Sequence, residues 1–144
     1  MLIQIWCPDR PDRLTEVVLL LLAVSFGVLA LIFLLTPVLL FEPIGLSEGS
    51  PALWAELRAG YGGHFGTAAI VFGISARRAE FQEPALAIGS LIFLGFVTGR
   101  CLSLLMDGVP THLVAIISLT AEAVVWVIVS LCWRRRRKIR LSGS

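Results

Sequence analysis

Four long apolar runs, separated by short polar segments, dominate the sequence. Each run holds 20 or more residues, enough for a helix to cross a hydrocarbon core of about 30 Å at a rise of about 1.5 Å per residue. Short connections between long helices make neighbouring helices antiparallel. The pattern predicts an all-α, polytopic membrane protein, an antiparallel up-down bundle of four transmembrane helices within residues 14–133. The predicted spans are Leu14–Phe41, Leu53–Ala76, Pro84–Met106 and His112–Trp133.

The composition agrees with a membrane location. Hydrophobic residues make up 57% of the chain and charged residues 15%, against about 25% charged residues in an ordinary soluble domain. The three cysteines are widely separated, and no cysteine or histidine spacing is typical of a metal site. We therefore expect no metal and no cofactor.

The basic residues between and beside the spans set the expected orientation. The segment 1–13 and the segment between the second and third spans carry two each, and residues 134–144 carry six. The other two connections carry none. Because basic flanks stay cytoplasmic, both termini are expected in the cytoplasm, with the protein in the inner (plasma) membrane of a bacterium. Residues 1–13 form a cytoplasmic N-terminal segment and residues 134–144 a polybasic cytoplasmic tail.

The polybasic tail could also indicate nucleic-acid binding. Its run Arg134–Lys138 directly follows a predicted span, and no aromatic interleaving or RNA-binding motif accompanies it. We interpret it as an anchor that attracts anionic lipid head groups, and we expect no nucleic-acid partner.

Ionisable and polar side chains within the spans are the candidate functional residues. A charge at the centre of a membrane costs about 2.5–3.5 kcal/mol on insertion scales, so it is normally paired, interior-facing or functional. The candidates form either a ligand-binding site or an internal ion-pair network. They are Glu56, His64, Arg100, Ser103, Asp107 and Glu122.

The charges within the spans do not balance. Glu56, Asp107 and Glu122 contribute three negative charges, and Arg58 and Arg100 contribute two positive charges. An excess buried carboxylate takes up a proton or finds a cation. The sequence leaves open whether Glu56 or Glu122 pairs with Arg100. Asp107 also has a purely structural interpretation, because it can accept hydrogen bonds from backbone N–H groups in the turn after the third span.

Helical periodicity groups the candidates into polar stripes. Glu56 lies with small residues on one stripe of the second span, Arg100 with Ser103 and Asp107 on the third, and Glu122 on the fourth. Since lipid offers no partner, we expect these stripes to meet inside the bundle. Arg58 points away from its stripe and is expected to be an interfacial anchor. The glycines expected to allow close helix packing are Gly60, Gly63, Gly95 and Gly99.

Three segments together resemble a known family. They are Glu56-Leu57-Arg58-Ala59-Gly60-Tyr61-Gly62-Gly63, then Gly99-Arg100-Cys101-Leu102-Ser103, then Asp107-Gly108-Val109-Pro110, with the later Glu122. This combination resembles the small four-span membrane family catalogued as domain of unknown function 4345. The resemblance implies a fold and a membrane location but no activity. In shape alone the architecture is also similar to DoxX-type membrane proteins, some of which serve quinone-linked redox systems.

The sequence favours two function classes equally. In the first, a polar pocket in the outer half of the bundle binds a small amphiphile, a lipid head group or a quinone. In the second, the chain is a structural or accessory subunit whose charges form a closed network. Its partner would be a second copy or another membrane subunit. An enzyme is disfavoured, because no serine–histidine–carboxylate set, metal-ligand cluster or HExxH occurs.

Overall fold

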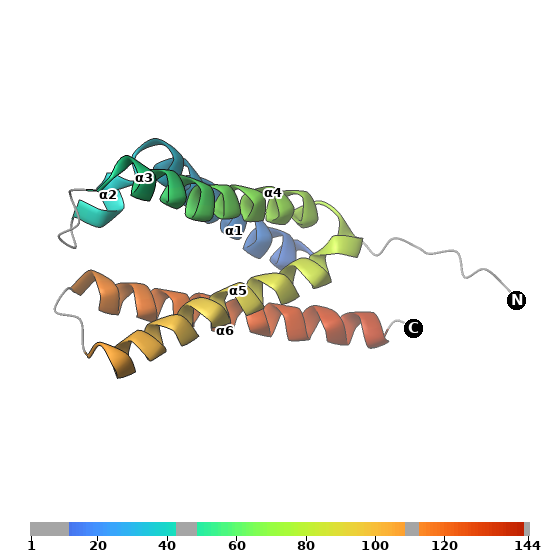
Figure 1. Cartoon of the computed structure of the whole chain (residues 1–144). Helices are drawn as coiled ribbons and strands as arrows, with labels where there is room; N and C mark the ends of the chain where they lie inside the picture. Colours follow the sequence, from blue (N-terminus) through green and yellow to red (C-terminus); the bar gives the residue numbers. More distant parts are fainter. Residues whose placement is uncertain (1–11, 43–48, 109–112, 143–144) are drawn as a thin grey trace, which may run out of the picture.

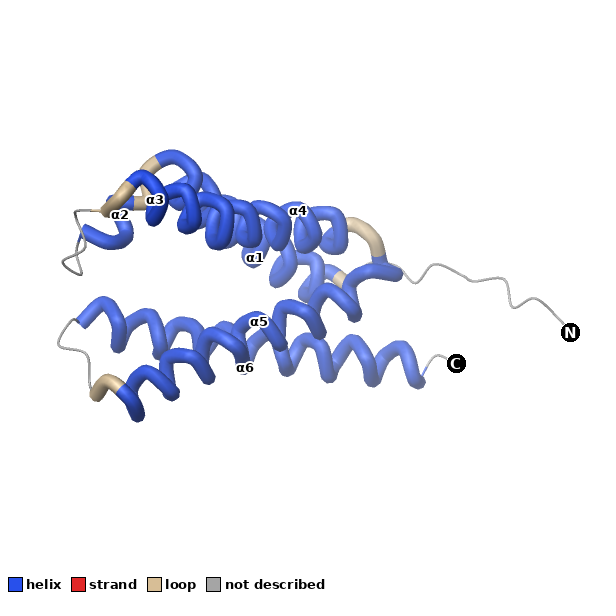
Figure 2. Tube along the Cα trace, in the orientation of Figure 1, coloured by secondary structure: helices blue, strands red, loops and turns tan. Residues whose placement is uncertain are grey.

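The computed structural model describes residues 12–42, 49–108 and 113–142, and these residues form helices and turns without a strand. Figures 1 and 2 show the arrangement. The all-α prediction is confirmed. The elements are α1 (Arg13–Leu35), α2 (Val38–Phe41), α3 (Pro51–Leu57), the π-helical segment η2 (Arg58–Gly63), α4 (His64–Ala76), α5 (Ala79–Met106) and α6 (Leu113–Ser142).

Three helices are long and apolar enough to cross a membrane. They are α1, α5 and the part of α6 at Ile116–Ile139. The second predicted span, Leu53–Ala76, falls on α3, η2 and α4, which have 7, 6 and 13 residues. None of the three alone has the length of a span. A helical membrane protein is supported, with three such helices among the described residues.

The helices form two layers (Figures 1 and 2). One layer contains α1 with α3, η2 and α4, and the other contains α5 and α6. We call the end where α1 begins and α6 ends the terminal end, and the opposite end, near α2 and α3, the loop end. The layers lie close together at the terminal end and diverge toward the loop end.

Proline and capping residues decide where the first two runs break. Asp12 caps α1 by accepting hydrogen bonds from Thr15 N at 3.3 Å and Thr15 Oγ1 at 2.8 Å. Pro37 has no N–H and disfavours helical backbone at Thr36, whose φ and ψ are −140° and 62°. The predicted span Leu14–Phe41 is therefore wrong at its end, since the long helix stops at Leu35 and α2 is a separate turn.

The helical path from α3 to α4 continues through η2. Ser50 caps α3 by accepting a hydrogen bond from Leu53 N at 3.2 Å. The backbone stays right-handed helical at Leu57, Arg58, Gly63 and His64. The wider π-helical turns hold three glycines, at positions 60, 62 and 63.

The interface between α1 and α4 is built from small residues. At three levels a Cβ added to a glycine would lie 3.8 Å from an alanine Cβ of the facing helix. Small residues let two backbones approach closely where lipid provides no hydrophobic drive for association. The facing pairs are Gly27 with Ala69, Gly66 with Ala30, and Gly73 with Ala23.

Aromatic rings join the two layers at mid-height. The ring of Phe26 on α1 lies 5.4 Å from that of Phe65, 5.5 Å from that of Phe72 and 5.8 Å from that of Phe93 on α5. Phe65 also contacts Phe96 of α5 at 6.2 Å. Edge-to-face pairs of this kind add about 0.5–1.5 kcal/mol each beyond the area they bury.

Gln82 ties the terminal end together. Its side chain is fully buried, its Oε1 accepts from Asp12 N at 3.2 Å, and its Nε2 donates to the Ala76 carbonyl at 3.1 Å. It lies in α5, which begins at Ala79 rather than at the predicted Pro84. Pro84 lies inside this helix, where it cannot donate a backbone hydrogen bond to the Glu80 carbonyl.

The fourth span also differs from its predicted bounds. The helix α6 runs on to Ser142, past the predicted end at Trp133, so the basic residues of the tail continue the helix. Arg135 reaches back to Asp12, with its Nη2 3.5 Å from Oδ1. Ser90 of α5 and Ser130 of α6 share a hydrogen bond of 2.7 Å between their hydroxyls.

Replacement of Gln82 by leucine is expected to destabilise the terminal end. It leaves the Ala76 carbonyl and the Asp12 N–H without their partner, so the free energy of unfolding should fall by about 1–3 kcal/mol. Thermal unfolding in mild detergent measures this. Thr98→Val, at an exposed position of the same helix, is the control, and equal melting temperatures for the two variants would contradict the assignment.

Neighbouring glycines of η2 should respond differently to alanine. A Cβ at Gly62 would lie 2.8 Å from side-chain atoms of Leu34, whereas a Cβ at Gly63 would meet no described atom within 4 Å. Both substitutions gain helix propensity, but only the first adds a clash. Gly62→Ala should therefore melt below Gly63→Ala in the same detergent, and the reverse order would show that α1 and η2 are packed differently.

Candidate functional site

Arg100 faces the opposite layer. It lies 11, 7 and 4 residues after Gly89, Phe93 and Phe96, a spacing that places all four on one face of α5. Phe93 and Phe96 of this face contact rings of α1 and α4. Arg100 is thus one helical turn beyond the last ring contact between the layers, toward the loop end.

Glu122 is placed in the same way on α6. Val125, Val129 and Trp133 follow it at helical spacing and belong to or pack against the buried core. The core-facing stripe of α6 therefore delivers the carboxylate to the same level as Arg100. The predicted stripes of the third and fourth spans meet at Arg100 and Glu122.

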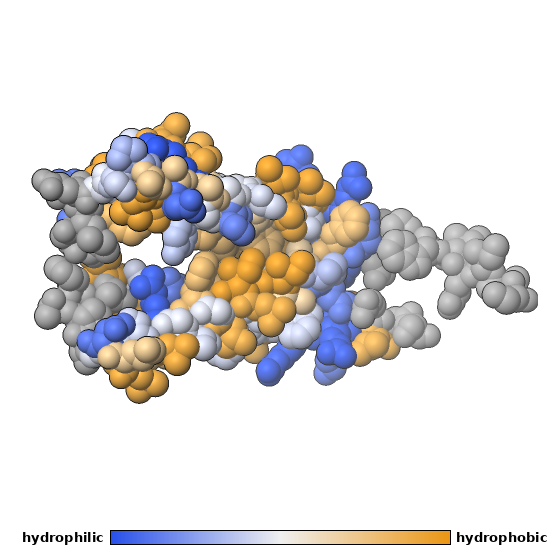
Figure 3. Space-filling view, viewed as in Figure 1, coloured by the Kyte–Doolittle hydropathy of each residue, from blue (hydrophilic) through white to orange (hydrophobic). Residues whose placement is uncertain are grey.

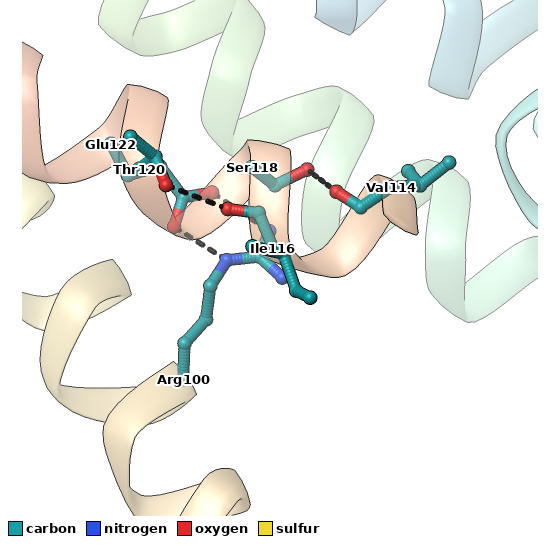
Figure 4. A network of polar contacts seen from close by, with 6 residues as sticks. All are labelled: Arg100, Val114, Ile116, Ser118, Thr120 and Glu122. Carbon is teal, nitrogen blue, oxygen red and sulfur yellow. Dashed lines mark hydrogen bonds and ion pairs between the residues drawn. The ribbon is translucent and has the colours of Figure 1, made fainter. Parts of the chain in front are cut away.

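Arg100 and Glu122 form a two-pronged ion pair (Figure 4). Arg100 Nε lies 2.5 Å from Glu122 Oε2, and Arg100 Nη2 lies 2.8 Å from Oε1. Parallel N–H···O bonds of this kind are stronger and more directional than a single one. The side chains keep 39% and 19% of their surface exposed in the chain. The structure pairs Arg100 with Glu122 and not with Glu56.

One edge of the guanidinium is left over. The pair uses Nε and Nη2, while Nη1 donates to no other described residue. Nearby hydroxyls are satisfied by their own helix: Ser118 donates to the Val114 carbonyl at 2.8 Å and Thr120 to the Ile116 carbonyl at 2.9 Å (Figure 4). Within the described residues, Arg100 is therefore the side chain that holds Glu122.

The surface is hollowed between the two layers at the loop end. The space-filling view in Figure 3 shows this opening with hydrophilic surface on both of its walls. Arg100 lies one helical turn beyond Phe96 on α5, so the ion pair is on the loop-end side of the last ring contact between the layers.

His64 lies on the layer opposite to the ion pair. Its Nδ1 is 2.5 Å from the Gly60 carbonyl. Because a carbonyl only accepts, Nδ1 carries the proton in this arrangement, and in the neutral imidazole Nε2 is then the acceptor. Val71 and Ser75, 7 and 11 residues later on the same face, line a groove against α5. His64 is exposed on that flank of α4.

The remaining predicted stripe does not enter the interior. Glu56, Gly60, Gly63 and Thr67 are all exposed, and Thr67 donates to the Gly63 carbonyl at 3.0 Å. No hydrogen bond or ion pair joins Glu56 to another described residue. The expectation that this stripe would meet the other two is wrong.

Ser103 and Asp107 pair with each other rather than with Arg100. Ser103 Oγ donates to Asp107 Oδ2 at 2.9 Å, and Asp107 N donates to the Ser103 carbonyl at 2.8 Å. Gly108 follows with a φ of +85°, the left-handed conformation that ends a helix. These two residues therefore terminate α5, and the predicted turn beyond Gly108 lies outside the described residues.

Arg58 has a partner within the chain. Its Nε donates to the Leu34 carbonyl at 3.0 Å, one of the last carbonyls of α1, which have no partner within the helix. An additional contact with lipid head groups stays a prediction.

The four glycines expected to pack helices have open space beside them. A Cβ built at any of them would meet nothing within 4 Å. Within one chain the close approaches are made by other glycines, so a packing role for these four requires a second chain and stays a prediction. They are Gly60, Gly63, Gly95 and Gly99.

Three side chains that make polar contacts between helices were not predicted from the sequence. Gln82, Ser90 and Ser130 make the polar contacts at the terminal end. Ser90 and Ser130 were detectable, since each is a polar residue inside an apolar run. Gln82 was assigned to a connection and gave no such signal. No group of three or more histidine, cysteine, aspartate or glutamate residues able to hold a metal occurs in the part of the chain that the structure describes.

Comparison with known proteins identifies a family but no activity. The model of a family described as Domain of unknown function (DUF4345) matches residues 14–133. No curated protein and no solved structure matches the chain.

A double-mutant cycle should show that Arg100 and Glu122 are energetically coupled. Each single change, Arg100→Gln or Glu122→Gln, leaves one charge without its partner, whereas the double change removes both. The coupling should be about 1–2 kcal/mol, measured by unfolding in mild detergent. Arg58→Gln combined with Glu122→Gln is the matched control, because these residues do not touch and should be additive. Additivity in the first cycle as well would contradict the pair.

Proposed function

The chain belongs to the DUF4345 family of unknown function, and we propose that it is a four-span membrane protein whose loop-end opening binds the polar head of a small amphiphile. The observation that carries this proposal is the ion pair of Arg100 and Glu122, held at the opening with one guanidinium edge unused.

Two features support a fourth crossing. Helix α4 lies along α1, which is itself long enough to cross a membrane. The helical path from Pro51 to Ala76 is continuous through η2. With four crossings, both termini share one side of the membrane. The exposed arginines at the terminal end make that side the cytoplasm, so the opening faces outward, in keeping with the inner membrane of a bacterium.

The chemistry of the pair narrows the class of ligand. Glu122 already neutralises Arg100, so the remaining N–H groups at Nη1 suit a neutral oxygen acceptor better than they suit a phosphate. A quinone carbonyl or a lipid ester carbonyl is such a group. Its apolar tail would lie between the layers against Phe65 and Phe96, which form the inner limit of the opening.

His64 supplies complementary chemistry on the other wall. Its Nε2 is free to accept a hydrogen bond from a hydroxyl, as a quinol or a glycerol-based lipid head provides. The residue follows directly on η2, and π-helical turns inside α-helices occur frequently at functional sites. A head group carrying both carbonyl and hydroxyl oxygens fits the two walls together.

The open glycines favour a second candidate, a structural or accessory subunit. Gly95 and Gly99 are exposed on α5 with nothing beside them, and a helix of a partner subunit could pack there. In that case the ion pair serves only to hold α5 to α6, and no small molecule is bound.

Ligand-dependent thermal stability separates the two candidates. Purified protein in mild detergent is melted with and without a panel of quinones and phospholipids. We expect at least one class to raise the melting temperature of the wild type by several degrees, as ligand binding to the native state requires. Arg100→Lys keeps the charge but lacks the second donor edge, so it should stay folded and lose most of that increase.

Ser130→Ala is the control for this experiment. It removes a contact between the same two helices on the terminal-end side of the ion pair, so it should lower the melting temperature while keeping the ligand-dependent increase. The binding proposal is overturned if no member of the panel stabilises the wild type, or if Arg100→Lys responds as the wild type does.

A further inference from the structure

A second feature lies at the opposite end of the molecule, between the end of α4 and the beginning of α5. There the two helices enclose an open groove of about 270 Å³. Buried Ser75 and Ala85 form its floor. Its walls are apolar and exposed, and they include Val71, Ile74, Phe81 and Ile88.

Two adjacent arginines lie in the turn that joins the two helices of the groove. Arg77 and Arg78 form the turn between α4 and α5, and both are exposed. Their backbone N–H groups donate to the carbonyls of Ile74 and Ser75, each at 3.3 Å. The turn is thus fixed on residues that line the groove. No side chain caps the start of α5, so the positive end of that helix adds to the two guanidinium charges.

We propose that this groove binds one acyl chain of an anionic phospholipid, with the lipid phosphate on Arg77 and Arg78. Arginine is well suited to phosphate because its planar donors form paired, charge-assisted hydrogen bonds. The groove spans Phe81 to Ile88, about 10 Å along α5, which accommodates the upper part of a chain that descends from a head group at the membrane surface.

The surrounding charges favour an anionic head over a zwitterionic one. Glu80 and Glu83 follow the turn in α5, so the excess positive charge at this end of the molecule comes from Arg77 and Arg78 together with the basic residues of α6. Arg134 and Arg137 are exposed in the last part of α6, which ends at the terminal end (Figure 1). A zwitterionic lipid offers the same chain and phosphate but carries a cation that these groups repel. This site is independent of the loop-end opening.

The test uses competition between two lipids with identical acyl chains. Detergent-solubilised full-length protein is incubated with equal amounts of phosphatidylglycerol and phosphatidylcholine, and bound lipids are counted by native mass spectrometry. The wild type should prefer phosphatidylglycerol. The double variant Arg77→Gln and Arg78→Gln should lose about 25-fold of that preference, since each basic residue near a lipid surface contributes about fivefold.

Two further variants distinguish lipid binding in the groove from a general attraction of anionic lipid to the basic residues. Val71→Trp fills the groove from an exposed position and should reduce binding of both lipids, although every charge remains. Arg134→Gln with Arg137→Gln removes the same charge from α6, where the groove does not reach, and should keep most of the preference.

The proposal is overturned by any of three results. These are an equal affinity of the wild type for both lipids, a loss in the α6 variant as large as in the turn variant, and unchanged binding in Val71→Trp. If the turn variant fails to fold, Arg77→Lys with Arg78→Lys should retain the preference, and Val71→Trp still decides whether the groove is used.

Discussion

Polar groups that lie in lipid must find their partners within the protein, because the hydrocarbon core offers none. In this chain, hydroxyl groups and charged groups find their partners in different ways. Hydroxyls at the loop end bond to carbonyls of their own helix, as Ser118 and Thr120 do. The charged groups cannot be satisfied in this way, so Arg100 and Glu122 meet across two helices. This requirement fixes how α5 and α6 are rotated relative to each other. Because these two helices form one layer, it fixes the arrangement of that layer.

The contrast between the two ends follows from what lies between the layers. Toward the terminal end, Gln82 links the starts of α1 and α5 to the end of α4, and the rings around Phe26 fill the space above it. Among the described residues, no ring contact joins the layers beyond Phe65 and Phe96. The layers therefore diverge where the ring contacts end, and the ion pair lies one helical turn beyond Phe96.

The sequence was sufficient to predict the helices, their approximate bounds and the presence of a pairing partner for Arg100. It could not choose between Glu56 and Glu122, because the choice depends on helix rotation. The π-helical turns of η2 change this rotation, because they contain more residues per turn than an α-helix. Glu56 therefore does not lie on the face that an uninterrupted α-helix ending in α4 would have given it. The break at Thr36 could have been predicted from Pro37, which disfavours helical backbone at the residue before it. The apolar run continues through this position, and the span was therefore predicted to continue as well. The extension of α6 through the basic residues was missed because charge marks a membrane boundary without ending a helix.

We expect the two layers to be apart at the loop end, with a ligand in the space between them. Spin labels at Gly63→Cys and at the native Cys101, both exposed, report on it in a chain whose other two cysteines are replaced by alanine. Pulsed electron paramagnetic resonance in liposomes gives the distance between them. We predict a broad distribution of distances that narrows when the stabilising amphiphile is added. A single narrow distribution that no quinone or lipid changes would show a closed bundle without a ligand between the layers.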